Sequence, residues 1–158
     1  MSPVRKHKSV GRKRLSSGVS ITIKNLQARI AISPRLIKQA AQKALSSIGK
    51  TISGEIAIFF VNDRRIKNLN RRFLGKNLAT DVLCFDLSVD RKGGLLADIF
   101  ISTDTAAQNS RNYGASIGDE INLYVIHAVL HLFGYRDDSP AQRQRMQEKQ
   151  RQILKCLS

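Results

Sequence analysis

The stretch His127-Ala-Val-Leu-His131-Leu-Phe-Gly134-Tyr-Arg-Asp137 combines a pair of histidines with a glycine and a carboxylate. Residues four apart lie on the same face of an α-helix, so His127 and His131 can bind one ion. Gly134 follows three residues later, where glycine commonly ends a helix in a left-handed turn. That turn brings Asp137 back towards the histidines. The stretch therefore predicts a long buried helix that ends at Gly134 and carries a metal site, with Asp137 as the third ligand.

An ordinary buried helix, whose histidines only hydrogen-bond to their neighbours, is the alternative interpretation. Two of the three histidines of the chain lie in this stretch, and the glycine and the carboxylate follow in register, which favours the metal site. In metallopeptidases with this spacing a glutamate follows the first histidine as general base, whereas here Ala128 follows it. Without that proton acceptor, peptidase chemistry is disfavoured. Metal-assisted phosphodiester cleavage fits better, because basic side chains can hold a charged backbone.

Length and composition limit the class of protein. The 158 residues fit one domain, and no apolar run reaches transmembrane length or resembles a signal peptide. The two cysteines, Cys84 and Cys156, are far apart and match no metal-binding spacing. We therefore expect a cytoplasmic protein with free thiols and no membrane partner.

The positive charge is concentrated near the N-terminus. The formal net charge is +15, no acidic residue precedes Glu55, and twelve of the 27 lysines and arginines do. Residues 1–17 are predicted to form a basic, flexible arm, and residues 18–158 a single domain. Such a charge favours a polyanion, and nucleic acid is preferred over an anionic membrane surface. Solubility alone is the alternative explanation.

Hydrophobic periodicity predicts strand, helix, strand, helix, strand, strand and then three helices. We expect strands near 19–23, 54–61, 82–85 and 95–101, and helices starting at 33–34, 62–63, 103, 116 and 139–140. The apolar run at 54–61 is predicted to be a central strand covered on both faces. The order indicates an α+β fold, a small mixed sheet of about four strands packed against several helices, with the metal site on a central buried helix.

Several blocks resemble, in order, the YbeY family of bacterial rRNA-maturation endoribonucleases. They are Leu69-Asn70-Arg71-Arg72-Phe73, Gly75-Lys76, Thr80-Asp81-Val82-Leu83-Cys84-Phe85, Ala97-Asp98-Ile99-Phe100-Ile101-Ser102 and the histidine stretch, so the resemblance covers roughly residues 19–138. It implies a single-strand-specific endoribonuclease with one divalent ion per chain, of the zinc type. It also implies a role in maturation of the 3′ end of small-subunit rRNA and in ribosome quality control, with ribosomal RNA and the ribosome as partners and no small-molecule cofactor.

Two positions depart from the family pattern. Asp137 stands where the family usually has a third histidine, which should broaden metal choice towards harder ions such as manganese, and Asp138 could compete as the ligand. Leu74 stands where the family tends to have an arginine linked to catalysis or RNA binding. Arg72 and Lys76 are the candidates to replace it.

Apart from these two candidates, the sequence assigns no catalytic side chain. The reaction is expected to use metal-activated water or a metal-polarised phosphate. The side chains expected to bind RNA are Arg71, Arg72, Lys76 and Arg136. Asp81 is expected to tie a turn, and Asp98 to form structural hydrogen bonds or to support a ligand histidine. A basic ribosome-associated or RNA-binding protein with a structural metal and little turnover is the alternative function.

Overall fold

The computed structural model describes residues 18–90 and 94–157. The predicted basic arm, residues 1–17, lies outside the described residues. The predicted order of strands and helices is confirmed. The elements are β1 (Val19–Asn25), α1 (Pro34–Ser47), β2 (Gly54–Val61), α2 (Asp63–Leu74), β3 (Val82–Asp86), β4 (Leu95–Ser102), α3 (Thr103–Tyr113), α4 (Ile117–Leu132) and α5 (Pro140–Lys155).

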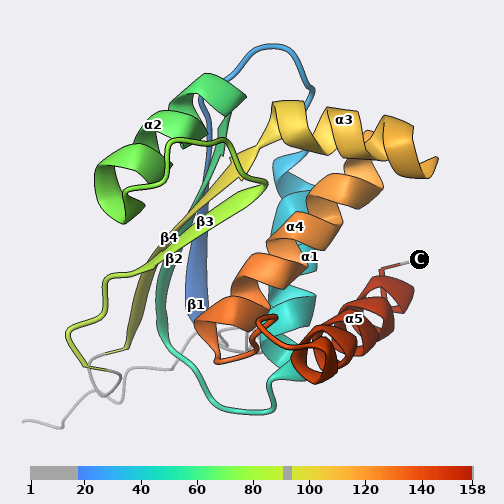
Figure 1. The fold of residues 1–158 in the computed structure, drawn as a ribbon. Coiled ribbons are helices and arrows are strands. Elements are labelled where there is room, and N and C mark those ends of the chain that lie inside the picture. The colour runs from blue at the N-terminus through green and yellow to red at the C-terminus, as the bar shows by residue number, and fades with distance from the viewer. Residues whose placement is uncertain (1–17, 91–93, 158) are drawn as a thin grey trace, which may run out of the picture.

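The four strands form one mixed sheet in the order β1-β2-β4-β3. β1, β2 and β4 are parallel, and β3 pairs antiparallel with β4. Helices α1 and α4 lie on one face of the sheet, α2 lies on the other, and α5 packs against α4 and α1 (Figure 1). This arrangement confirms the predicted α+β class.

Alternation along β2 shows how the two faces differ. Ile56, Ile58 and Phe60 point to the face under α1 and α4 and are buried. On the opposite face Glu55 is exposed and Phe59 is only partly buried. The prediction of a central strand is confirmed, but full cover on both faces is wrong. The short α2 covers only the end of that face, where Val61, Ile66 and Leu83 form a small second core.

Helix starts follow the predicted capping residues. The side chains of Ser33, Asn62, Ser116 and Ser139 each accept a hydrogen bond from a backbone N–H three residues further on. Such caps satisfy N–H groups that have no partner within the helix. None of the helices in the described part of the chain is long and apolar enough to cross a membrane.

Candidate metal centre

Helix α4 positions the two histidines and then ends as the sequence predicts. Gly134 has a φ of 89°. The N–H of Tyr135 donates to the carbonyl of Leu130 at 3.1 Å, and the N–H of Gly134 donates to that of His131 at 3.1 Å. This pair of hydrogen bonds is a Schellman motif, which satisfies the last carbonyls and reverses the chain. Asp137 is thereby returned to the histidine face of α4.

Three ligand atoms converge on one point. Nε2 of His131 lies 2.9 Å from Nε2 of His127, and Oδ2 of Asp137 lies 3.6 Å from the first histidine and 3.5 Å from the second. Three ligands of a tetrahedral zinc ion at bond lengths near 2.0–2.1 Å are separated by about 3.3 Å. His127, His131 and Asp137 are the one group in the described part of the chain that could hold a metal ion. The donor set and its spacing fit such an ion.

Electrostatics favours the metal-binding form of His127. Burial and then the neighbouring His131 lower the pKa of His127 below its ordinary value of 6.5. Nδ1 of this ring lies 3.3 Å from Oε1 of Gln150 on α5. An amide oxygen can only accept, so Nδ1 carries the proton and the lone pair of Nε2 faces the other ligands. A neutral imidazole with this tautomer is ready to bind a cation.

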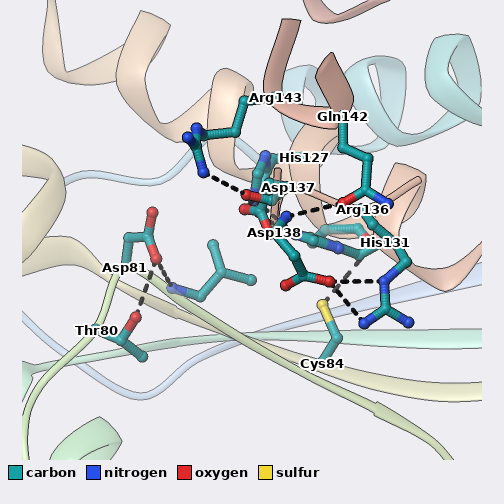
Figure 2. A network of polar contacts seen from close by, with 12 residues as sticks. Thr80, Asp81, Cys84, His127, His131, Arg136, Asp137, Asp138, Gln142 and Arg143 are labelled. Atoms are coloured by element: carbon teal, nitrogen blue, oxygen red, sulfur yellow. Dashed lines mark hydrogen bonds and ion pairs between the residues drawn. The ribbon is translucent and has the colours of Figure 1, made fainter. Parts of the chain in front are cut away.

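The centre opens into a cleft of about 690 Å³. Thr80, Asp81 and Cys84 come from the β3 side of this cleft and face the histidines of α4 (Figure 2). Asp81 accepts hydrogen bonds from the N–H of Val82 at 2.8 Å and from the hydroxyl of Thr80 at 3.1 Å. Both partners are immediate neighbours of Asp81, where the chain bends without a hydrogen-bonded turn, and the same carboxylate also lines the cleft.

The predicted RNA-binding side chains lie in three different places. Lys76 lines the cleft. Arg71 and Arg72 are exposed on α2 and are not among the cleft residues, and Cζ of Arg72 lies 5.5 Å from the centre of the Phe73 ring. Arg136 forms an ion pair of 2.6 Å with Asp138.

Three further residues that the sequence singled out can also be placed: Leu74, Asp138 and Asp98. Leu74 is 53% exposed and lines the cleft. The Asp138 carboxylate binds Arg136 and does not join the three-ligand group. Asp98 pairs with Phe85 in the sheet and alternates with the core residues Ala97 and Ile99. It therefore points to the face away from α4, and the idea that it supports a ligand histidine is wrong.

Sequence reasoning missed two side chains of α5 that reach the centre, Gln150 and Arg143. Gln150 is only 7% exposed and lies in register with Met146 and Ile153, which are both buried. A glutamine within an apolar stripe is a signal that could have been used, because a buried amide needs a partner. Arg143 carries no such signal, since its side chain is exposed.

Comparison with known proteins gives the family. The family model described as Endoribonuclease YbeY matches residues 22–158. An Endoribonuclease YbeY of Anaeromyxobacter sp. is 41% identical over 123 residues, which are 77% of this chain and 64% of that relative, so the chain spans slightly less than two thirds of its length. An Endoribonuclease YbeY of Syntrophus aciditrophicus is 33% identical over 145 residues, 88% of this chain and 90% of the relative.

A solved structure shows the same fold. The solution structure of TM1509 from Thermotoga maritima has a TM-score of 0.58 to this chain, with 24% identity and 88% of each chain covered. At that identity the likeness concerns the fold alone. The family match, in contrast, extends over most of the sequence and includes the histidine stretch, so the chain belongs to the Endoribonuclease YbeY family.

Proposed function

We propose that this chain is a metal-dependent endoribonuclease that hydrolyses single-stranded RNA. The observation that carries the proposal is the convergence of His127, His131 and Asp137 at an open cleft. The relatives that match the chain are named endoribonucleases. A site in a wide cleft suits a polymer better than a small molecule, since small-molecule sites enclose most of their ligand.

The residues at the centre have different roles in the proposed reaction. When bound, a divalent ion supplies Lewis acidity towards a phosphoryl oxygen and activates water. His127 and His131 provide neutral nitrogen donors, and Asp137 provides one negative charge. Lys76 lines the cleft, where its ammonium group can bind a backbone phosphate. In the hydrolysis, oxygen from water bonds to phosphorus, one P–O ester bond breaks, and the departing oxygen takes up a proton.

Zinc is the ion that we propose for the centre, with one ion per chain. Two imidazoles and a carboxylate are common zinc ligands. The carboxylate in place of a third imidazole makes the site more tolerant of manganese, because oxygen donors suit harder ions.

The proposed substrate is the 3′ end of small-subunit ribosomal RNA, cleaved during ribosome maturation and quality control. Support comes from the family and from the net charge of +15, which favours a polyanion. The ribosome as a partner and the cytoplasmic location stay predictions.

One observation favours a second function, an RNA-binding protein with a structural metal. Among the described residues that line the cleft, Lys76 is the one lysine or arginine, and Leu74 lies there where an arginine was expected. Fewer cations at the reacting phosphate mean less stabilisation of the developing charge. Such a protein would bind RNA with a steep salt dependence but turn over little.

A single-turnover assay separates the two functions. Protein is stripped of metal, zinc or manganese is added back, and cleavage of single-stranded ribosomal RNA is followed on a gel. The proposed function predicts cleavage that returns with metal and is lost in His131→Ala and Asp137→Ala. Asp138→Ala is the matched control and keeps its activity. Metal-independent binding without cleavage would support the structural-metal alternative.

A further inference from the structure

Two hollows in the surface meet at the metal centre. Besides the cleft, a hollow of about 270 Å³, called here the side hollow, is lined mainly by residues of α4 and α5. Asp81, His127 and Asp137 line both the cleft and the side hollow. An RNA that is cut internally continues from the reacting bond in two directions. From the shared ligands the cleft extends past His131 and Leu132 at the end of α4, and the side hollow extends towards Leu123 and Tyr124 earlier in that helix.

The side hollow contains an arginine placed next to a metal ligand. Nη1 of Arg143 donates to the carbonyl oxygen of Asp137 at 3.2 Å, and Figure 2 shows the guanidinium beside that residue. No carboxylate among the described residues forms an ion pair with Arg143. A guanidinium has five N–H donors, so this hydrogen bond fixes its position and leaves others for a ligand.

Size and charge indicate which ligand the side hollow would take. Its volume of about 270 Å³ lies just below the range of about 300–1,000 Å³ for small-molecule sites, which suits one nucleotide. Of the lining residues that the structure describes, Arg143 is the one lysine or arginine in the side hollow, and Lys76 is the one in the cleft. Among the described residues each hollow therefore offers one cation, and the two hollows extend from the shared ligands along different parts of α4.

We infer that the side hollow is a second RNA subsite. In it Arg143 binds the backbone phosphate adjoining the scissile one, on the flank opposite to the RNA held in the cleft. Arginine matches the geometry of a phosphate with two parallel hydrogen bonds, which a lysine does not. The inference rests on the proposed function and adds to it the residue that holds the second flank.

A structural role for Arg143 is the competing explanation, because its bond to Asp137 also ties the loop after α4 to α5. Arg145 gives a matched control. It lies on the same helix, is exposed and lines a different hollow that contains none of the metal ligands. Arg143→Ala and Arg145→Ala remove the same charge from α5, so a difference between them is not a general loss of positive charge.

The experiment uses the zinc-loaded full chain and oligonucleotides of one cleavable sequence. In each, a neutral methylphosphonate replaces one phosphate near the cleaved bond. We expect the methylphosphonate at one flanking position to lower the wild-type kcat/KM roughly tenfold. This is the rate change that the loss of one hydrogen bond to a charged group typically causes. Arg143→Ala should start about tenfold lower and lose nothing further at that position, while Arg145→Ala should behave as wild type. Arg143→Lys should recover part of the response.

Two measurements make the outcome specific. First, the zinc affinity measured by competition titration should be the same in wild type and in Arg143→Ala. Second, the metal-free Arg143→Ala protein should bind the unmodified RNA more weakly than the metal-free Arg145→Ala protein does, as measured by fluorescence anisotropy. If Arg143→Ala does not fold, Arg143→Gln replaces it, since its amide keeps an N–H donor. A variant that cleaves but keeps the full methylphosphonate response overturns the subsite. Failure of the wild type to cleave any RNA overturns the proposed function instead, and the subsite with it.

Discussion

Oε1 of Gln150 lies 3.3 Å from Nδ1 of His127, and this contact joins the last helix to the metal centre. Partners of this kind orient a ligand histidine and typically change metal affinity 10–100-fold when they are lost. We predict that Gln150→Leu lowers zinc affinity by about tenfold or more, whereas Gln150→Glu retains an acceptor and keeps the affinity. The tautomer of His127 in the metal-free protein, read by ¹⁵N NMR, should shift towards Nε2–H in Gln150→Leu.

Gln147 is the control for this change, because it lies on the same helix and is exposed. Gln147→Leu should change neither the tautomer nor the affinity. An unchanged tautomer in Gln150→Leu would show that Gln150 only fills space.

The third ligand gives a second prediction. Asp137→Asn keeps the shape of the side chain but removes its charge and weakens its oxygen as a donor, so zinc affinity should fall by at least about tenfold. Asp137→His should retain zinc and shift the preference away from manganese, because imidazole suits softer ions. Competition titrations with both metals measure this. Asp138→Asn should leave affinity unchanged, since that carboxylate binds Arg136; an equal loss in this variant would make Asp138 the ligand.

The two cysteines should differ strongly in reactivity. Burial, with a smaller effect of Asp81, raises the pKa of Cys84 to about 12, and Cys156 is exposed. The thiolate is the reactive form, and a thiol with such a pKa is roughly one part in ten thousand ionised at pH 8. Iodoacetamide should therefore label Cys156 quickly and Cys84 very slowly. Mass spectrometry of Cys84→Ser and Cys156→Ser gives the two rates; fast labelling of Cys84 would contradict its raised pKa.

Acid should destabilise the metal-free protein through His127. Its pKa is lowered on folding by burial and by His131, so below the ordinary value of 6.5 the unfolded chain binds more protons than the folded one. The free energy of unfolding should then decrease as the pH falls from 6.5 towards the lowered pKa of His127. Below that pKa both states bind the proton, so His127 causes no further decrease. Urea titrations between pH 5 and pH 8 measure the decrease. His127→Gln should show a smaller one, and an equal slope in both proteins would assign the effect elsewhere.

Gly54 provides a test of the sheet. Its φ is 137°, and a Cβ at this position would lie 2.0 Å from the carbonyl oxygen of Leu95 on β4. Neither the dihedral angle nor the backbone contact can be relieved by moving a side chain, so Gly54→Ala should cost at least about 2 kcal/mol in unfolding free energy. Chemical denaturation measures this. Gly118→Ala in α4, where the nearest atom would be Oγ of Ser116 at 3.8 Å, should be tolerated.

Much of the fold could be predicted because its signals are local. Ser33, Ser116 and Ser139 cap their helices through bonds to residues three positions away, and Gly134 ends α4 through bonds to the preceding turn. The period of the apolar residues gave the order of the strands and helices. The partial cover of β2 could not be predicted, because it depends on how far α2 reaches across the sheet.

In the candidate site, too, the features set by local sequence could be predicted and those set by long-range packing could not. His127, His131 and Asp137 were recognised because helix periodicity and one glycine turn bring them together within eleven residues of chain. Resemblance to a family also made Lys76 a candidate RNA-binding side chain, and Lys76 lines the cleft. The sequence did not separate Lys76 from Arg71 and Arg72, which lie outside the cleft, because adjacent helix and loop residues point in different directions.

Gln150 and Arg143 became part of the centre only through packing. Both lie on α5, after the turn that follows α4, and which of its side chains reach His127 and Asp137 depends on how that helix packs against α4. Local hydrogen bonds and hydrophobic periodicity specify the elements and a ligand set close in sequence. The partners of those ligands and the two hollows beside them come from long-range contacts, for which spacing along the chain carries no information.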